Sequence, residues 1–475
     1  MSDLHKLGLK EVLDGVKNKT FSCEELVRET LSVCEEKSEL NSFIVLDKEG
    51  ALNKAKELDR KIAQEEAVGA LAGALVGVKD IICVKGLKNT CASKMLENFV
   101  PPYNATVVSR LLSEDAIVIG KTNTDEFACG GSTETSFFGV TKNPYDLERV
   151  AGGSSGGSAV AVSADLCTFA LGTDTGGSIR QPASFCNVYG LKPSYGLVSR
   201  SGVVSMASSW DTIGHFAKSV EDLATVLNII AGKDRKDSTS VEKTSDDYRE
   251  FLGRGVSGVK IGVPEEYFAE GVEAETSEIV KGRILELEKQ GAEIVPISLS
   301  MTKYALSVYY ISMPAELSAN LERFDGVRYG HKPKEYSDIV DYYFKARGEG
   351  FGAEIKRRII TGTYVLSAGY YDAYYKKAQK VRGLIIEDFK KAFEKCDVLI
   401  TPVSPFPAFK IGEKADNPLG MYMADILTIP VSAGGFPSLA CPAGFSKDGL
   451  PIGLQIIGPY LGEGKCIRVA DAISI

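Results

Sequence analysis

The sequence predicts an α/β fold with a large core, because apolar runs of strand length alternate with amphipathic stretches of helical length. The chain has 475 residues, of which 44% are hydrophobic and 25% are charged, a composition typical of globular proteins. The formal net charge of −8 gives no broad basic surface for nucleic acid, so any contact with RNA is expected to be indirect.

The N-terminal part predicts helices and one short strand. Ser22 and Glu25 have the spacing of a capping box, and apolar residues then recur on one helical face. Further elements are expected in this order: a strand at 41–46, a helix at 48–64, a strand at 77–83, a helix at 106–113 and a strand at 116–120. The C-terminal half predicts strands at 259–263 and 293–297 around a helix at 277–290, then a long helix at 364–393 and a buried strand at 397–401.

We expect a single domain over residues 1–475, because no internal repeat or low-complexity tail divides the chain. It comprises a helical N-terminal segment (1–66), a core (67–232) and a C-terminal part with additional helices (257–475). The most polar stretch, 232–247, predicts a surface loop between the last two parts.

Neither export nor a membrane span is expected. Residues 1–10 are mixed and polar, and the longest apolar runs have the length of strands. The ten cysteines are scattered without a C-x-x-C pair, which predicts buried thiols in a reducing compartment rather than disulfides or a zinc site. The sequence therefore predicts a cytoplasmic protein without a bound metal.

Two glycine–serine clusters carry most of the functional information. They lie at Gly152–Ser158 and Gly172–Ser178, on either side of a short apolar run. Glycine is favoured where backbone approaches another group closely, and the serines offer hydroxyl nucleophiles, so hydrolysis or acyl transfer is indicated. Neither cluster has the spacing of a phosphate-binding P-loop or of a dinucleotide-binding turn. Tight connections in a large sheet remain the structural alternative.

A serine nucleophile needs a base, and histidine is the weaker candidate here. None of the three histidines lies beside an obvious acid, and the residues around Ser178 lack the G-x-S-x-G pattern of many hydrolases. Lys79 instead lies in an apolar run, where burial would lower the pKa of its amine. Deprotonating an ordinary lysine at pH 7 costs about 4.6 kcal/mol. An ion pair between Lys79 and Asp80 is the structural alternative, and the residues alone leave it open.

These residues resemble the amidase signature family, whose hallmark is a Ser–cis-Ser–Lys triad in a glycine- and serine-rich stretch. The matching motifs are V-K-D at 78–80, G-G-S-S-G-G-S at 152–158, G-T-D-T-G-G-S-I-R-Q-P-A at 172–183 and G-L-K-P-S-Y-G at 190–196. The resemblance implies the amidase-signature fold, a large mixed β-sheet with helices on both faces. It also implies Ser178 as the nucleophile, Ser154 as the bridging serine and Lys79 as the base.

The same resemblance implies an oxyanion hole formed by the backbone N–H groups of Thr175, Gly176 and Gly177. Glycines without side chains let successive N–H groups converge on one oxygen. Each such donor typically contributes about 3–4 kcal/mol to lowering the barrier.

Motifs outside the signature are similar to one branch of the family, the glutaminase subunits of tRNA-dependent amidotransferases. They are T-C-A-S-K-M-L-E-N-F at 90–99, D-E-F-A at 125–128, G-G-S-T-E at 130–134, R-F-D-G-V-R-Y-G at 323–330 and A-G-Y-Y-D-A-Y-Y-K-K-A-Q-K-V-R at 368–382. This resemblance implies that glutamine is hydrolysed to glutamate and ammonia. The ammonia would pass to a tRNA-binding kinase and transamidase subunit, which uses ATP and magnesium to amidate Glu-tRNA(Gln), and a small third subunit would complete a heterotrimer. Asp-tRNA(Asn) stays open as a second acceptor.

Glutamine recognition is implied, by the same resemblance, at three further residues. Arg358 would bind the α-carboxylate through a forked guanidinium, Asp425 would bind the α-ammonium, and Tyr309 would lie nearby. From the residues alone, Arg358 is equally a solvated charge on a basic helix face, and Asp425 is equally a cap or surface carboxylate. The alternative functions are a stand-alone amide hydrolase, which has no use for this charged pair, and a non-catalytic assembly subunit, which has none for the triad.

Some positions depart from the family pattern or carry weaker hypotheses. The departures are Leu75, Ala151 and His215 in place of common prolines, Asp165 in place of a common glycine, and a chain end at Ile475 ahead of the final helix expected of the family. His215 is expected to be a structural turn residue, and Cys129 and Cys186 are expected to be buried thiols. The tyrosines of 370–375 are expected to pack rather than to stack on bases.

Overall fold

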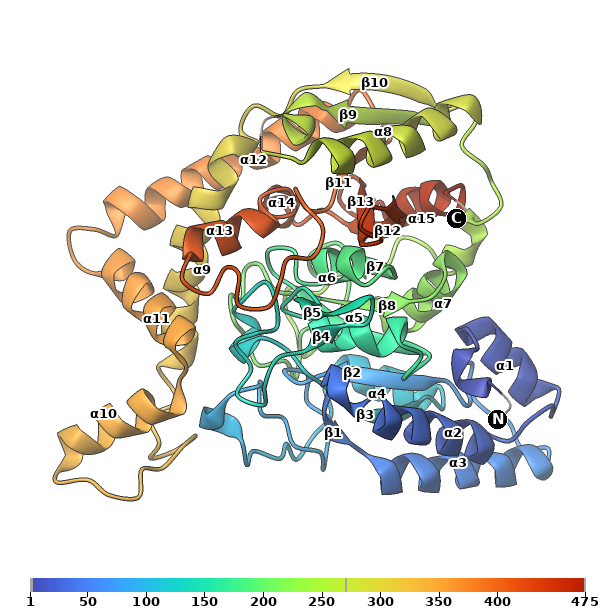
Figure 1. Cartoon of the computed structure of the whole chain (residues 1–475), viewed down its shortest axis with the longest axis horizontal. Helices are drawn as coiled ribbons and strands as arrows, with labels where there is room; N and C mark the ends of the chain where they lie inside the picture. Colours follow the sequence, from blue (N-terminus) through green and yellow to red (C-terminus); the bar gives the residue numbers. More distant parts are fainter. Residues whose placement is uncertain (1–2, 270, 474–475) are drawn as a thin grey trace.

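The computed structural model describes residues 3–269 and 271–473, and its framework is one large twisted sheet (Figure 1). The strands are β1 (Phe43–Leu46), β2 (Leu75–Lys79), β3 (Ile117–Thr122), β4 (Lys142–Asn143), β5 (Asp146–Val150), β6 (Phe169–Asp174), β7 (Tyr189–Lys192), β8 (Thr212–Ala217), β9 (Lys260–Pro264), β10 (Glu293–Ile297), β11 (Val398–Pro402), β12 (Ser438–Phe445) and β13 (Pro451–Ile457). Eleven of them follow the order β1-β3-β2-β6-β8-β7-β12-β13-β11-β9-β10, and β4 and β5 form a separate pair. The large sheet is mixed, since β2 runs parallel to β3 and β6 whereas β6 runs antiparallel to β8.

The helices surround this sheet. The α-helices of the described residues are α1 (Leu9–Lys17), α2 (Cys23–Glu36), α3 (Lys48–Ala63), α4 (Thr106–Ser113), α5 (Gly156–Ser163), α6 (Arg180–Phe185), α7 (Val220–Ile230), α8 (Ala274–Lys289), α9 (Ala305–Leu321), α10 (Ile339–Gly350), α11 (Ala353–Leu366), α12 (Lys377–Phe393), α13 (Pro418–Tyr422), α14 (Ile429–Gly434) and α15 (Glu463–Asp471). The capping box expected at Ser22 is present at the start of α2, where the N–H of Glu25 donates to the Ser22 hydroxyl.

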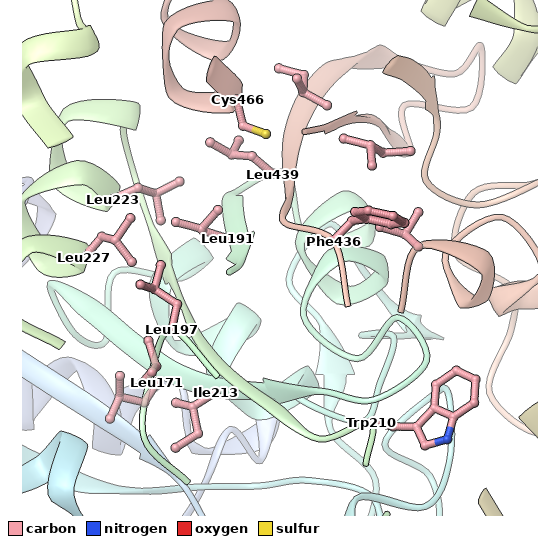
Figure 2. Packing of buried hydrophobic residues seen from close by; sticks show 14 of the residues in the cluster. Leu171, Leu191, Leu197, Trp210, Ile213, Leu223, Leu227, Phe436, Leu439 and Cys466 are labelled. Carbon is pink, nitrogen blue, oxygen red and sulfur yellow. The ribbon is translucent and has the colours of Figure 1, made fainter. Parts of the chain in front are cut away.

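Both faces of the sheet are buried, because alternate residues of a strand point to opposite sides. In β6, Phe169 and Leu171 belong to one hydrophobic cluster and Ala170 belongs to another. Helices α4 and α7 contribute to the first cluster, whereas α2, α3 and α5 contribute to the second. Figure 2 shows part of the first cluster, including Leu191 of β7 and Leu223 of α7. Each fully buried leucine of this kind stabilises the fold by about 1.5–3 kcal/mol, and helices cover both faces as predicted.

Helices α9, α10 and α11 form an extension beside the sheet, drawn in yellow and orange in Figure 1. The extension is anchored where α11 packs against α9. A Cβ atom on Gly362 of α11 would lie 1.9 Å from the carbonyl oxygen of Pro314 in α9, so only glycine permits this approach. The close packing fixes the position of α11 along α9.

Two predicted elements differ from those observed. The strand expected at 77–83 is β2, which ends already at Lys79, where the N–H of Ile82 turns back to the Lys79 carbonyl at 2.9 Å. The prediction of one helix over 364–393 is wrong, because α11 ends at Leu366 and helical structure resumes only at Asp372, with a π-helical turn (Asp372–Lys376) that leads into α12. Gly369, between them, has a φ of +85°, which interrupts a right-handed helix and suits glycine.

The departures from the family pattern have separate outcomes. Asp165 has a φ of +62°, which explains why glycine is favoured at this position, and its carboxylate pairs with Lys218 at 2.6 Å. Leu75 and Ala151 are buried. The expectation that His215 is a turn residue is wrong, because it lies in β8 with its Nε2 2.9 Å from the carbonyl oxygen of Leu223. Ile475 lies outside the described residues.

Candidate active site

The sheet brings Lys79 to the two glycine–serine clusters. Strands β2 and β6 are parallel neighbours with Val78 opposite Leu171, so both strands end at the same edge of the sheet. β2 ends at Lys79, and β6 ends at Asp174, directly before the functional part of the second cluster. The first cluster leads into α5, which packs against β2 and β6. Segments far apart in the sequence thus meet at one end of the sheet.

The amine of Lys79 is buried against the serines of the first cluster. Its Nζ lies 2.8 Å from Oγ of Ser154 and 2.8 Å from Oγ of Ser155, and the Gly153–Ser154 peptide bond is cis. Burial disfavours the ammonium and lowers the pKa of Lys79 to about 7, although buried aspartates nearby oppose the shift. A substantial fraction of the amine is therefore neutral at pH 7.

The hydroxyl of Ser154 can donate to the lone pair of a neutral Lys79, whereas that of Ser155 already has another acceptor. The hydroxyl of Ser155 donates to the carbonyl of Thr173 at 3.0 Å, so its oxygen is left to accept a hydrogen bond from Lys79. Lys79 Nζ also lies 3.5 Å from the Thr173 carbonyl oxygen. The ammonium form can donate to all three oxygens, of Ser154, Ser155 and Thr173, whereas a neutral amine has only two N–H donors and one lone pair. The lone pair can then take the hydroxyl proton of Ser154.

The alternative ion pair between Lys79 and Asp80 is not formed. The Asp80 carboxylate lies 3.3 Å from Nζ of Lys121 and also accepts hydrogen bonds from the backbone and side chain of Thr90. Lys121 in turn donates to the Asn89 side chain at 2.6 Å. Asp80 is therefore engaged by another buried network, and Lys79 is left to the serines.

Ser178 is held against the first cluster by its backbone. The N–H of Ser155 donates to the carbonyl of Ser178 at 3.1 Å. Ser154 is completely buried, whereas Ser178 retains 5% exposure. Of the two serines, Ser178 is thus the one that a small substrate could reach.

The loop 175–177 presents free backbone donors beside Ser178. Its three N–H groups have no hydrogen-bond partner within the part of the chain that the structure describes. The loop is braced on both sides: the Thr175 hydroxyl donates to Asp211 at 2.7 Å, and Asp174 forms a buried ion pair with Arg180 at 2.9 Å. Fixed and unpaired N–H groups of this kind can stabilise a developing oxyanion.

The glycines of this loop let two further side chains approach it. A Cβ atom on Gly177 would lie 2.8 Å from Oδ1 of Asp425, and one on Gly176 would lie 3.1 Å from the hydroxyl of Tyr309. Burial raises the pKa of the Tyr309 hydroxyl, the nearby charge of Asp425 adds to the rise, and that of Arg358 opposes it. The three residues predicted to recognise glutamine therefore share one buried region next to the loop.

Arg358 and Asp425 each have an unsatisfied polar atom in this region. Nη1 of Arg358 and Oδ1 of Asp425 are buried and have no hydrogen-bond partner among the described residues. Arg358 is only 4% exposed, so its interpretation as a solvated surface charge is wrong, and so is that of Asp425 as a surface carboxylate at 7% exposure. Burial raises the pKa of Asp425 to about 8. A ligand with one carboxylate and one ammonium would satisfy both atoms.

Three residues around Arg358 were missed by sequence reasoning. Glu354 accepts from Nε of Arg358 at 2.6 Å, and the guanidinium carbon lies 4.6 Å from the ring centroids of both Tyr310 and Tyr422. A glutamate four residues before an arginine is a common helical ion pair, but only the fold shows that this pair is buried. Ser155 was also missed, because two adjacent serines in the motif look equivalent in the sequence.

The weaker candidates take no part in this constellation. Cys129 and Cys186 are buried thiols, as expected. Tyr370, Tyr371 and Tyr374 do not pack into the core, since they are about 40% exposed and contact neighbouring tyrosine rings.

Three further features bear on the function: a separate cavity, metal-binding clusters and membrane-spanning helices. A cavity of about 1190 Å³ is lined by residues such as Phe99, Arg323 and His331 and by none of the predicted site residues. Within residues 3–269 and 271–473, no cluster of three or more His, Cys, Asp or Glu side chains has the arrangement of a metal site. No helix among the described residues is sufficiently long and apolar to cross a membrane.

Comparison with known proteins identifies the family. A family profile described as Amidase matches residues 25–467, which is most of the chain. The chain belongs to the amidase family. Among its curated relatives, the A subunit of the glutamyl-tRNA(Gln) amidotransferase of Persephonella marina is 52% identical over 470 residues, 99% of this chain and 97% of the relative. The protein of the same name from Thermoanaerobacter pseudethanolicus is 54% identical over 471 residues, 99% of this chain and 96% of the relative.

Solved structures of other amidases share the fold. The crystal structure of the A subunit of the Thermotoga maritima glutamyl-tRNA(Gln) amidotransferase aligns with a TM-score of 0.82 and 40% identity, and covers 100% of this chain and 95% of that one. A bacterial aryl acylamidase of the amidase signature enzymes aligns with a TM-score of 0.87 and 26% identity, over 99% and 96% of the two chains. The predicted family and fold class are thereby confirmed.

Proposed function

We propose that this amidase is the glutaminase subunit of a tRNA-dependent amidotransferase. The observation that carries the proposal is the pair of unsatisfied buried atoms, Nη1 of Arg358 and Oδ1 of Asp425. Buried polar atoms without partners are costly, so a site that keeps one arginine donor and one carboxyl oxygen unsatisfied is suited to a zwitterionic ligand. The α-carboxylate and α-ammonium of glutamine would complete them. The relatives named above belong to glutamyl-tRNA(Gln) amidotransferases, which supports this choice of substrate.

In the proposed first step, Oγ of Ser178 attacks the carbon of the glutamine side-chain amide. Its proton passes to Ser154, whose own hydroxyl proton passes to the neutral amine of Lys79. The 2.8 Å separation of Lys79 Nζ and Ser154 Oγ and the lowered pKa of Lys79 support this route. The oxyanion that forms would accept hydrogen bonds from the free N–H groups of residues 175–177.

In the second half of the reaction, the tetrahedral intermediate collapses. Lys79 returns its proton through Ser154 to the amide nitrogen, the carbon–nitrogen bond breaks, and ammonia leaves a glutamyl ester on Ser178. A water molecule then attacks the ester carbonyl, its proton follows the same route to Lys79, and glutamate is released as Ser178 regains its proton. The same three side chains thus act as base and then as acid in both halves.

The ammonia requires an acceptor, which we propose to be held by a partner protein. This partner would be a tRNA-binding kinase and transamidase subunit that uses ATP and magnesium to activate Glu-tRNA(Gln), with Asp-tRNA(Asn) as an open alternative. A small third subunit would complete a heterotrimer. Contact of this chain with tRNA would be indirect, in line with its net charge of −8. The chain would act in the cytoplasm as a single amidase domain over residues 1–475.

The alternatives are a stand-alone amide hydrolase and a non-catalytic assembly protein. An enzyme for apolar amides gains nothing from a buried Arg358 and Asp425, and a non-catalytic protein gains nothing from a buried lysine beside two serines. The test is release of ammonia and glutamate from L-glutamine by the full chain, alone and with the proteins that co-purify with it. Hydrolysis of aryl or fatty amides without hydrolysis of glutamine in either preparation would overturn the proposal.

A further inference from the structure

The guanidinium of Arg358 is held by Glu354 at its Nε, away from the unsatisfied Nη1. Glu354 lies one helical turn earlier on α11, and its Oε1 accepts from Nε of Arg358 at 2.6 Å. Nη1, at the other end of the same guanidinium, has no partner among the described residues. Because the five donors of a guanidinium form a rigid planar fork, fixing Nε also fixes the direction of the free edge.

Glu354 also contacts the segment that carries Asp425. The hydroxyl of Tyr422 donates to the same oxygen, Oε1 of Glu354, at 3.2 Å. Tyr422 ends α13, and the short turn Met423–Asp425 follows it directly. The ring of Tyr422 stacks on that of Tyr310 at a centroid distance of 3.9 Å. One carboxylate therefore joins α11 to the chain segment that positions Asp425.

We propose that Glu354 is a positioning residue for substrate selection, which orients Arg358 toward the α-carboxylate of glutamine and sets its spacing from Asp425. The inference rests on the proposed function and adds to it a residue that touches neither the substrate nor the reacting atoms. Tyr310 and Tyr422 contact the face of the guanidinium, and the hydrogen bond to Glu354 adds the directional contact that decides which edge stays free. The charge of Glu354 also balances that of Arg358 before the substrate arrives.

The test compares Glu354→Ala with Glu354→Gln in the full chain. Loss of the hydrogen bond to a charged group predicts a rise in KM for L-glutamine of roughly 10- to 100-fold for Glu354→Ala, with little change in kcat. In Glu354→Gln, the carbonyl oxygen of the new side-chain amide can still accept the hydrogen bond from Nε of Arg358. This variant should therefore keep most of the affinity for glutamine. Arg357→Ala is the matched control, because Arg357 is half-exposed on the same helix and pairs with the other oxygen of Glu354. Its KM should stay at the wild-type value.

Truncated substrates separate positioning from a general structural role. Glutaramic acid retains the carboxylate but lacks the ammonium, and 4-aminobutanamide retains the ammonium but lacks the carboxylate. Glu354→Ala should weaken the first and leave the second unchanged, and it should add nothing in an Arg358→Ala background. Equal losses of affinity for L-glutamine, glutaramic acid and 4-aminobutanamide in Glu354→Ala would overturn the positioning role. An additive loss of affinity in the Glu354→Ala/Arg358→Ala double variant would overturn it as well. If the wild-type chain hydrolysed none of the three substrates, the proposed glutaminase activity would be rejected instead. Calorimetric titration of glutamine into Ser178→Ala, with and without Glu354→Ala, would still measure the effect of Glu354 on binding.

Discussion

A lysine can act as a base at neutral pH only if burial keeps a large part of it uncharged. Burial lowers the pKa of Lys79 from 10.5 to about 7, so about half of the molecules carry a neutral amine at pH 7 and about one tenth at pH 6. An ordinary lysine with a pKa of 10.5 would be neutral in about 0.03% of molecules at pH 7. The fold therefore increases the population of the base roughly 1,500-fold at this pH. We expect kcat for glutamine to rise about fivefold between pH 6 and pH 7 and to level off above pH 8.

The same shift has a defined effect on stability. Between about pH 7 and pH 10.5 the unfolded chain keeps a proton on Lys79 that the folded chain has lost. The unfolded state thus binds more protons in this range, and the contribution of Lys79 to the free energy of unfolding increases with pH. The lowered pKa works against folding at neutral pH, which is the cost of a buried base.

The assay is the pH dependence of glutamine hydrolysis by Lys79→Ala and by Lys192→Met. Lys79→Ala should lose most of kcat, and its residual activity should show no rise near pH 7. Lys192→Met is the matched control, because burial also lowers the pKa of Lys192 to about 7 while its Nζ donates to the carbonyl of Phe436 at 2.8 Å, away from the serines. Its profile should keep the wild-type rise. A rise near pH 7 that survives in Lys79→Ala, or disappears in Lys192→Met, would refute the assignment of the base.

Three further substitutions test other parts of the site. Ser178→Ala should abolish ammonia release from glutamine while ammonia-dependent amidation of tRNA by the complex persists; retained glutaminase activity would exclude Ser178 as the nucleophile. The pKa of about 8 for Asp425 leaves about one tenth of its carboxyl ionised at pH 7, so KM for glutamine should fall as pH rises to about 8. Asp425→Asn should have a high KM without this pH dependence, and an unchanged KM would remove Asp425 from the substrate site. Arg180→Ala leaves Asp174 buried without its partner and should lower the free energy of unfolding in urea by about 3–5 kcal/mol, whereas a loss below about 1 kcal/mol would mean that the pair is solvated.

Most of the fold could be predicted because its signals are local. The capping box at Ser22 and the apolar runs of β2 and β3 identify a helix and two strands without knowledge of their neighbours. Predictions failed where tertiary contacts decide. The helical pattern over 364–393 continues through Gly369, and only the observed positive φ there shows where α11 and α12 separate.

The candidate site divides in the same way. Its serines and glycines are adjacent in the sequence, so the clusters are visible as motifs, and the resemblance assigns them roles. The competition between Asp80 and the serines for Lys79 could not be decided from the sequence, because the partner that occupies Asp80 is Lys121 on the neighbouring strand. Arg358 stands among charged neighbours in the sequence, and its burial against Tyr310 and Tyr422 depends on three separate segments.

Burial at one edge of the sheet explains why catalysis and selection belong to the same site. Removal from water favours the neutral form of each isolated group, so it lowers the pKa of Lys79 and raises that of Asp425. The neutral amine is then available as a base, whereas the carboxyl of Asp425 becomes fully charged only when an ammonium arrives beside it. An apolar amide without an ammonium or a carboxylate would meet a protonated Asp425 and leave Nη1 of Arg358 without a partner. The pocket that activates the serine therefore also disfavours substrates that lack the charges of glutamine.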